Sequence, residues 1–322
     1  MTVLVTGASG FLGRAVAAEL VARGHTVRSL QRRPSQVDGV TDVRGSVADP
    51  ALIARAVDGA TSVVHLAAKV SLTGTLQDFR AVNVEGTRSL IDAAERAGVT
   101  GFVYVSSPSV AHVGAALAGV GAEPASPRHA QGHYARTKAE AELLALARDS
   151  TGLQVVAIRP HLIWGPGDTQ LIERIVERAR RGRLPLLNGG TALIDTTYID
   201  NAATGIVAAL DRLPRAHGNA YVLTNGEPRP VGELMAGICR AAGVHPPRWS
   251  VPAGVALTAG TAIEKVWAVL PTRDEPPMTR FLAQQLSTAH WFDQRETRRA
   301  LDWSPTVSID EGLDRLARSY AA

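Results

Sequence analysis

Short apolar runs alternate with helical patterns through the first half of the chain. The runs are rich in Val, Leu and Ile, lack the alternation of a half-exposed strand, and lie at residues 3–7, 26–32, 62–68, 101–107 and 154–160. Helical patterns fall between them at about 11–23, 82–97 and 134–148. Continuous apolar strands are typical of a parallel sheet that is covered on both faces. The alternation therefore predicts an α/β fold with a doubly wound parallel (Rossmann) sheet.

The rhythm changes after residue 165, where Pro and Gly become frequent. TTYIDNAATGIVAAL and AYVLTN, however, have the pattern of elements that return to the main sheet. We expect a dinucleotide-binding domain at residues 1–165, with returning segments near 191–225. Residues 166–190 and 226–322 are then expected to form a smaller, discontinuous substrate-binding lobe at the carboxyl ends of the strands, where open α/β sheets bind ligands.

A glycine-rich turn lies directly between the first predicted strand and the first predicted helix. TGASGFLG places Gly7, Gly10 and Gly13 at GxxGxxG spacing. Glycine allows the tight turn and the close approach of a pyrophosphate, and the N-terminus of the next helix offers N–H donors and a favourable dipole. In this strand–helix context the pattern predicts a dinucleotide-binding loop. A turn with only a structural purpose is the alternative.

The end of the second predicted strand bears on the choice between NADP and NAD. NAD sites often carry an acid there, which binds the ribose hydroxyls. Here the strand ends at Arg32 and Arg33, and no carboxylate occupies the position. Guanidinium groups suit a 2′-phosphate, so NADP is favoured. NAD stays the alternative, because Asp42 and Asp49 lie a little further along the chain.

Tyr134 and Lys138 are four residues apart in HYARTK, at the start of the third predicted helix. Residues at this spacing share a helix face. An ammonium beside a phenol favours the phenolate, so we expect Lys138 to lower the pKa of Tyr134 and to make proton transfer practical near neutral pH. Taken alone, the pair does not indicate catalysis, because Tyr and Lys at this spacing are common on helices.

A set of motifs gives the chain a resemblance to a known family. The set consists of TGASGFLG, HLAA (65–68), NVEGT (83–87), SSPSV (106–110), HYARTK, RPHLIWGPGD (159–168) and YIDNA (198–202). In this order the motifs closely resemble the extended short-chain dehydrogenase/reductase family, from residue 2 to beyond 310. The sequence from EPPMTRFLAQQL to SIDEGL resembles the 3β-hydroxysteroid dehydrogenase branch, and within it the bacterial 2-alkyl-3-oxoalkanoate reductases of olefin biosynthesis.

The resemblance implies a catalytic triad of Ser107, Tyr134 and Lys138. Tyr134 would protonate the carbonyl oxygen during reduction, Ser107 would align that oxygen, and Lys138 would also hold the nicotinamide ribose. Ser106 is the competing serine. The cofactor contacts that the resemblance implies are Gly7, Ser9, Gly10, Phe11, Leu12, Gly13, Arg32, Arg33, Ala67, Asn83, Tyr134, Lys138 and Pro160.

Three further residues are candidates for contact with the substrate. Ser109 follows the catalytic serine, His161 follows a strand end that faces the expected nicotinamide pocket, and Trp164 lies shortly beyond it. Trp164 could instead fill the core. We expect His112 and His133 in loops or at the surface, although either could flank the substrate.

Composition and charge exclude several classes of function. The net charge is only +4 and long basic runs are absent, which argues against nucleic acid as a partner. His, Cys, Asp and Glu show no metal-ligand spacing, so no metal is expected. The single cysteine, Cys239, suits a reducing compartment, and we expect a cytoplasmic protein without a signal peptide or membrane span.

The most apolar segment, residues 251–270, contains Glu264 and Lys265. Its apolar residues recur at helical spacing from Val255 to Leu270, which predicts an amphipathic helix. Peripheral association with a membrane or an enzyme complex stays open. The family resemblance implies a homodimer through the helices near 83–97 and 134–148.

Together these features predict an NADPH-dependent reductase of a ketone or 3-oxo group. The expected substrate is a hydrophobic small-molecule carbonyl compound, such as a 2-alkyl-3-oxoalkanoate or a steroid-like carbonyl. A nucleotide-sugar epimerase is one alternative, weakened by the missing acid after the second strand. A non-catalytic Rossmann redox-sensing or binding protein is another, weakened by the intact Tyr–Lys pair.

Overall fold

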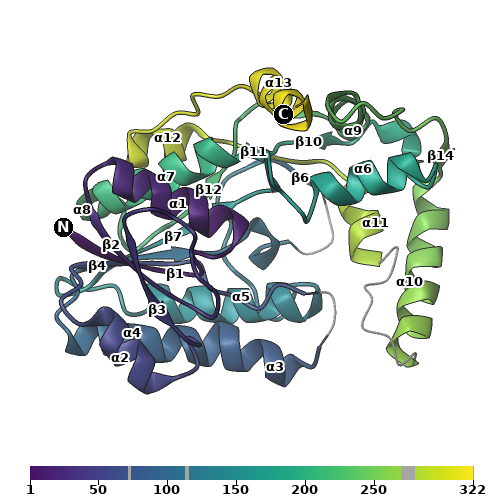
Figure 1. The fold of residues 1–322 in the computed structure, drawn as a ribbon. Coiled ribbons are helices and arrows are strands. Elements are labelled where there is room, and N and C mark those ends of the chain that lie inside the picture. The colour runs from purple at the N-terminus through teal and green to yellow at the C-terminus, as the bar shows by residue number, and fades with distance from the viewer. Residues whose placement is uncertain (72–73, 113–115, 270–279, 322) are drawn as a thin grey trace.

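Seven parallel strands form the centre of the protein (Figure 1). The computed structural model describes residues 1–71, 74–112, 116–269 and 280–321. The central strands are β1 (Thr2–Thr6), β2 (Thr26–Gln31), β3 (Val40–Arg44), β4 (Ser62–His65), β5 (Gly101–Val105), β7 (Gln154–Pro160) and β12 (Ala220–Leu223). Their order is β12-β7-β5-β4-β1-β2-β3, which reverses between β1 and β4. The prediction of a doubly wound sheet is confirmed, and this reversal is where such sheets bind ligands.

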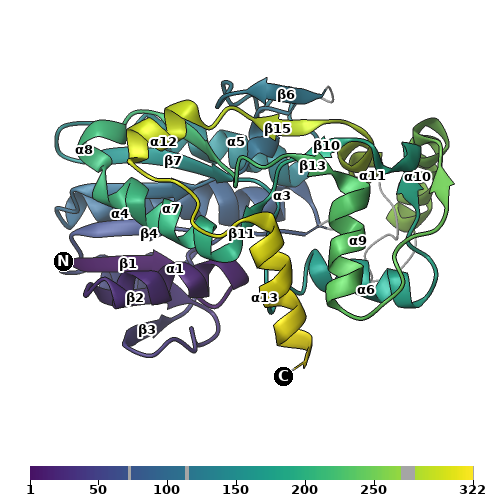
Figure 2. The same ribbon diagram turned by 90° about the horizontal axis from the view of Figure 1, so that it is seen from above.

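Helices cover both faces of the sheet (Figures 1 and 2). One face carries α1 (Phe11–Ala22), α7 (Ile199–Asp211) and α8 (Leu213–Ala216), and the other carries α2 (Pro50–Val57), α3 (Leu76–Arg80), α4 (Gly86–Arg96) and α5 (Gly132–Leu146). Successive residues of a strand point to opposite faces, so the central strands contribute side chains to both of two separate apolar clusters, which explains the continuous apolar runs in the sequence.

Two central elements were absent from the sequence prediction. β3 has partly exposed positions along one edge of the sheet, so it lacks a long apolar run. α2 begins at Pro50, and the Asp49 side chain accepts hydrogen bonds from the backbone N–H groups of Ala51 and Leu52. The helix predicted at 82–97 is also divided: α3 and α4 flank a π-helical turn, η1 (Ala81–Glu85).

Smaller sheets and helices form the rest of the molecule. A four-stranded sheet joins β6 (Leu117–Val120), β10 (Leu193–Ile194), β13 (Arg229–Pro230) and β15 (His290–Phe292), and two-stranded sheets join β8 (Ile163–Trp164) to β11 (Thr197–Tyr198) and β9 (Leu186–Leu187) to β14 (Ser250–Val251). The remaining elements are α6 (Ile172–Arg180), α9 (Val231–Ala241), α10 (Ala253–Val269), α11 (Arg280–Ser287), α12 (Arg295–Leu301), α13 (Ile309–Ala321), and the 3₁₀ turns η2 (Pro108–Val110) and η3 (Asn188–Gly190). β6 and β15 lie together along one edge (Figure 2).

The segment after residue 191 contributes to more than one sheet. β12 is the last strand of the central sheet and α7 packs against α1, whereas β11 pairs with β8 outside that sheet. The division of the chain into two lobes at residue 165 stays a prediction.

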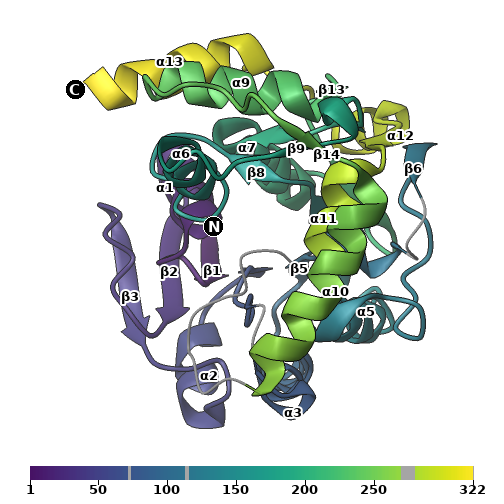
Figure 3. The same cartoon turned by 90° about the vertical axis from the view of Figure 1, so that its right-hand side faces the viewer.

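The amphipathic helix predicted near 255–270 corresponds to α10, which packs along α11 (Figure 3). The buried face differs from the predicted one, because Ala256 and Gly260 are buried while Val255 is 58% exposed. The position of α11 decides which face of α10 is covered, and the sequence pattern does not reveal that position. Leu270 lies outside the described residues. Among the described helices, none is long and apolar enough to cross a membrane.

Candidate active site

The glycine loop between β1 and α1 leaves no room for side chains. Gly7 has φ +77°, and a Cβ atom there would lie 2.9 Å from the Ala67 nitrogen. A Cβ atom at Gly13 would lie 2.1 Å from the Gly7 carbonyl oxygen. No side chain caps the N-terminus of α1 at Gly10. This close-packed glycine turn, followed by a helix end without a side-chain cap, fits the pyrophosphate of a dinucleotide.

The carboxylate nearest the end of β2 comes from β3. Asp42 accepts hydrogen bonds from Ser29 Oγ at 2.5 Å, Gln31 Nε2 at 2.9 Å and the Ser35 N–H at 3.0 Å. Asp42 is therefore occupied by neighbouring protein groups. Arg32 and Arg33 follow directly after β2 and are exposed. Arg32 and Arg33, which the sequence predicts beside the adenosine ribose, are thus exposed cations.

A hydrogen-bond chain joins the glycine loop strand to α4. Thr87 Oγ1 donates to the Asn83 carbonyl, so it must accept from His65 Nε2 at 2.9 Å. His65 Nδ1 then accepts from Thr6 Oγ1 at 2.6 Å, and Thr6 in turn accepts from the Ala67 N–H. Burial, with a smaller effect of Lys138, lowers the pKa of His65 to about 3. This neutral imidazole therefore fixes the positions of β1, the loop after β4 and α4 relative to one another.

Asn83, which was expected near the cofactor, connects this region to α5. Its side-chain oxygen accepts from the Lys69 N–H at 2.7 Å, and its amide donates to Thr137 Oγ1 at 3.0 Å. The side chain is buried and engaged at both ends. Asn83 therefore connects the loop after β4 to α5 at Thr137, which lies between Tyr134 and Lys138.

Ser107 and Tyr134 meet at the carboxyl end of β5. Ser107 precedes η2, and its Oγ accepts from the Ser109 hydroxyl at 3.0 Å. Burial raises the pKa of Tyr134 to about 12, and a hydrogen bond with Ser107 opposes that rise. The expectation that Lys138 lowers the pKa of Tyr134 is therefore wrong for this structure, because loss of hydration has the larger effect. The competing serine, Ser106, is buried and does not line the cavity described below.

Lys138 is buried behind Tyr134. Its Nζ donates to the Val105 carbonyl at 2.6 Å and lies 4.1 Å from the centre of the Tyr104 ring. Burial lowers the pKa of Lys138 to about 7, although the negative charge of Glu142 opposes this. Glu142 itself forms a two-point ion pair with Arg159, at 2.9 and 2.5 Å. The pair fixes α5 against β7, and both side chains are almost fully buried.

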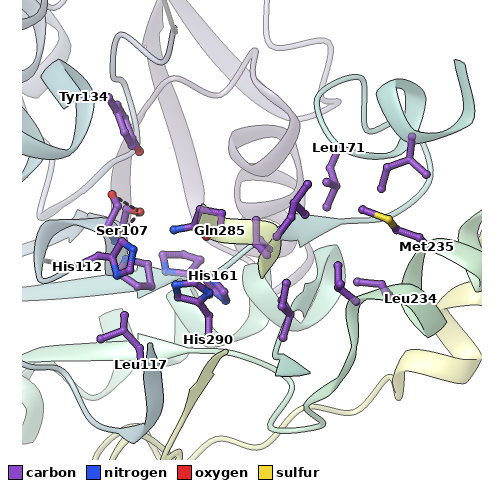
Figure 4. A pocket seen from close by; sticks show the side chains of 18 residues that line it. Ser107, His112, Leu117, Tyr134, His161, Leu171, Leu234, Met235, Gln285 and His290 are labelled. Carbon is purple, nitrogen blue, oxygen red and sulfur yellow. Dashed lines mark hydrogen bonds between the residues drawn. The ribbon is translucent and has the colours of Figure 1, made fainter. Parts of the chain in front are cut away.

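A cavity of about 250 Å³ opens beside Ser107 and Tyr134 (Figure 4). It is lined by Ser107, Pro108, Ser109, His112, Leu117, Tyr134, Pro160, His161, Leu162, Leu171, Ile175, Ile194, Val231, Leu234, Met235, Gln285, Leu286 and His290. Ser107, Tyr134 and the histidines lie at one end, and Leu171, Leu234 and Met235 lie at the other. The cavity thus offers hydrogen bonds at one end and an aliphatic surface at the other.

Three buried histidines line the polar end. His161 and His112 each lie next to His290, with ring centres 6.1 and 4.9 Å apart. His112 lies in the loop after η2, as expected, but it is only 1% exposed, and its ring packs against that of His290 in β15. The sequence did not single out His290, whose position depends on the pairing of β15 with β6, and no local motif marks it. His133 is exposed, as expected.

Of the three residues predicted to contact the substrate, two line this cavity and one does not. Ser109 and His161 line it, as does Pro160. Trp164 does not: its ring is fully buried, its Nε1 donates to Thr196 Oγ1 at 2.9 Å, and it packs edge-on against Tyr198. Trp164 therefore fills the core, which was the alternative for this residue. Within the described residues, no group of three or more His, Cys, Asp or Glu side chains is arranged so that it could hold a metal ion.

Residues 4–253 match the model of the 3-beta hydroxysteroid dehydrogenase/isomerase family. The 2-alkyl-3-oxoalkanoate reductase of Stenotrophomonas maltophilia is 43% identical over the full length of both chains. The protein of the same name from Shewanella oneidensis is 36% identical over 98% of this chain and 85% of its own length. A solved structure of MoeE5 in complex with UDP-glucose and NAD has a TM-score of 0.77 and covers 100% of this chain and 99% of its own, but at 24% identity it supports the fold alone.

The matched residues include the glycine loop at the topological switch point. They also include Ser107 and Tyr134, which lie beside the cavity. The chain belongs to the 3-beta hydroxysteroid dehydrogenase/isomerase family of extended short-chain dehydrogenases/reductases, and it is an NAD(P)-dependent oxidoreductase that acts on carbonyl or hydroxyl groups.

Proposed function

We propose that the protein is an NADPH-dependent reductase of the 3-oxo group of 2-alkyl-3-oxoalkanoates. The observation that carries the proposal is the shape of the cavity, which has Ser107 and Tyr134 at one end and an aliphatic surface at the other. A 2-alkyl-3-oxo acid has a polar head and hydrocarbon branches, which suit the two ends. The similarity to the two 2-alkyl-3-oxoalkanoate reductases, at 43% and 36% identity, supports the same substrate class.

In this proposal, Tyr134 and Ser107 act on the oxygen of the ketone. Ser107 donates a hydrogen bond that aligns the carbonyl oxygen, and the Tyr134 hydroxyl transfers its proton to that oxygen as the bond to carbon becomes single. The high pKa of Tyr134 keeps the phenol protonated before the reaction. Bound NADPH supplies the hydride to the carbonyl carbon.

Lys138 is proposed to assist Tyr134 once the cofactor is bound. In the structure its ammonium donates to the Val105 carbonyl at the end of β5, directly beside the catalytic serine strand. With the cofactor bound, Lys138 would hold a ribose hydroxyl, and its positive charge would stabilise the phenolate that forms during reduction. The glycine loop would hold the pyrophosphate, and Arg32 and Arg33 would hold the 2′-phosphate.

Turnover of matched substrates tests the proposal. Purified protein is mixed with NADPH and a freshly prepared 2-alkyl-3-oxoalkanoic acid, and absorbance at the nicotinamide band is followed. We expect oxidation of NADPH with formation of the 2-alkyl-3-hydroxy acid. A UDP-sugar serves as the comparison substrate, and activity with the UDP-sugar alone would contradict the proposal.

The homodimer expected from the family resemblance also stays a proposal. α4 and α5 lie side by side on one face of the sheet, and Leu143 of α5 is 45% exposed there. Light scattering on the intact protein would decide it, with a mass of one chain as the contradicting result.

A further inference from the structure

The histidine end of the cavity contains buried ring nitrogens without partners. Within the described part of the chain, both ring nitrogens of His112 and the Nδ1 of His290 are buried and lack a hydrogen-bond partner. The two residues are each 1% exposed. A buried polar atom that stays unpaired destabilises the fold. The two residues that carry these three atoms line one cavity, and a ligand group that enters the cavity could complete their hydrogen bonds after a small movement of the rings.

His161 has a fixed tautomer that points to the same conclusion. Its Nδ1 lies 2.6 Å from the carbonyl oxygen of Asp195, and a carbonyl can only accept. Nδ1 therefore carries the proton, and Nε2 of the neutral ring is bare. A ring anchored in this way can gain a second proton at Nε2 and then donate to an anion.

The charges of the residues that line the cavity indicate which kind of ligand group the histidines can bind. Among the described residues, none of those that line the cavity is a lysine, arginine, aspartate or glutamate. An anion buried there needs a positive partner, and the three imidazoles are the lining groups that can become cations near neutral pH. In a 2-alkyl-3-oxo acid, the carboxyl carbon and the ketone carbon are both bonded to carbon 2. When the ketone meets Ser107 and Tyr134, the carboxylate must therefore lie at the same end of the cavity as the histidines (Figure 4).

We propose that His112, His161 and His290 form the carboxylate-binding site of the substrate, and that one imidazole takes up a proton as the acid binds. The inference rests on the proposed function, and it adds the residues that distinguish an acid from a neutral ketone. Without ligand, burial lowers the pKa of His161 to about 3 and that of His290 to about 4, so the rings are neutral. A bound carboxylate raises these pKa values, because it stabilises the imidazolium.

Few other groups influence this proton uptake. Among the described residues, the titratable groups around the three rings are the rings themselves, the Tyr134 phenol and Asp195; the Gln285 amide and the Thr288 hydroxyl, whose Oγ1 lies 3.4 Å from His290 Nε2, are uncharged. The Asp195 carboxylate accepts from Thr224 Oγ1 and the Gly226 N–H, so it is already satisfied.

The oxidation direction gives the sharpest test, because 2-alkyl-3-hydroxy acids do not decarboxylate spontaneously. The acid and its methyl ester are compared as substrates with NADP⁺, in the wild type and in His112→Phe and His290→Phe. We expect kcat/KM for the acid to fall roughly 10- to 100-fold in each variant, the range for a lost hydrogen bond to a charged group. The ester should change less than about twofold, since it carries no charge. His112→Gln and His290→Gln, which keep an N–H donor but cannot be protonated, replace any variant that does not fold.

The pH profile and a control variant complete the test. In the wild type, the ratio of kcat/KM for acid to that for ester should fall as pH rises, because imidazolium becomes harder to form. The fall should be shallower in the protein with both His112 and His290 replaced, which keeps His161, and His245→Gln, which changes an exposed histidine outside the cavity, should behave as wild type. An unchanged acid-to-ester ratio in the cavity variants would overturn the inference and leave the proposed function intact. Wild-type protein that oxidises neither substrate would overturn both.

Discussion

Tyr134 shows how a single side chain can be prepared for its task by burial. The free phenol already holds its proton at neutral pH, and burial raises its pKa further, to about 12. That is the protonation state needed by a group that donates a proton to a carbonyl oxygen. Ser107 lies at hydrogen-bond distance and would share the charge that develops on the oxygen. The chemistry proposed here therefore depends on position more than on an activated phenolate.

Replacement of Tyr134 by Phe should remove the proton donor while keeping the ring. We expect kcat for ketone reduction to fall by about 10²- to 10⁴-fold, the usual contribution of a positioned acid. NADPH affinity, measured by fluorescence titration, should not change. Tyr320→Phe, at a partly exposed tyrosine of α13, is the matched control. A variant with wild-type kcat would remove Tyr134 from the mechanism.

Arg32 and Arg33 give a prediction about cofactor choice. Joint replacement by Ala should weaken NADPH binding by about 10- to 100-fold, since hydrogen bonds to a charged group are lost, and should leave NADH binding nearly unchanged. Calorimetric titration of both nucleotides measures the difference. Arg55→Ala, an exposed arginine of α2, is the control. Equal weakening for both nucleotides would contradict a role in 2′-phosphate binding.

At the scale of elements, the position of α5 depends on one buried ion pair. Glu142 lies one helical turn beyond Lys138, and Arg159 reaches it from β7 just before Pro160 and His161. Arg159 also donates to the Glu123 carbonyl at 2.7 Å. The pair therefore connects the helix that carries Tyr134 and Lys138 to the strand end that lines the cavity.

Glu142→Ala should destabilise the protein by about 3–5 kcal/mol, because it leaves the Arg159 guanidinium buried without its partner. Denaturant unfolding followed by circular dichroism measures the loss. Glu177→Ala removes half of an exposed pair with Arg181 and should cost about 1 kcal/mol or less. Joint replacement by Glu142→Leu and Arg159→Met should recover much of the lost stability. Equal effects of the two single variants would show that the buried pair has no special weight.

At the scale of the whole molecule, buried histidines make stability depend on pH. Burial lowers the pKa values of His65 and His161 to about 3 and that of His290 to about 4, below the ordinary value of 6.5. The unfolded chain therefore binds more protons between these values, so the stability is fully present above pH 6.5 and is lost as pH falls. Asp195 opposes this trend, because burial raises its pKa to about 6 and favours the folded state as that group is protonated.

Three histidines outweigh one aspartate, so the free energy of unfolding should fall as pH is lowered from about 6.5 toward 4. Each histidine contributes at most about 1.4 kcal/mol per pH unit. Urea unfolding at a series of pH values measures the slope. His290→Gln should make the slope shallower, whereas His245→Gln should not. A stability that is flat or rises on acidification would contradict neutral buried imidazoles.

Local sequence was sufficient for most of the central sheet and for the glycine loop. Strands buried on both faces need continuous apolar residues, and the turn at Gly7 needs a residue that tolerates positive φ, so both leave a pattern in neighbouring positions. β3 and α2 were missed because one lies at the sheet edge with exposed positions and the other is short.

The motifs also brought Ser107, Tyr134 and Lys138 to one place in the sequence-based hypothesis, and the first two do line one cavity. Asp42 and His112 were beyond such reasoning. The neighbours of Asp42 become known only once β3 pairs with β2, and those of His112 only once β6 pairs with β15.

The sequence by itself predicted most of the sheet and the glycine loop, because each depends on spacing within one segment, and the resemblance of its motifs to a family supplied the candidate residues for proton transfer. The tertiary structure alone decided the substrate cavity. His290 lies 178 positions after His112, yet their rings are adjacent, since burial and charge at a site arise from contacts between segments that no local pattern encodes. The shift in the pKa of Tyr134 is opposite to the predicted one for the same reason. The sequence shows the spacing of Tyr134 from Lys138, but it does not show the burial that raises this pKa.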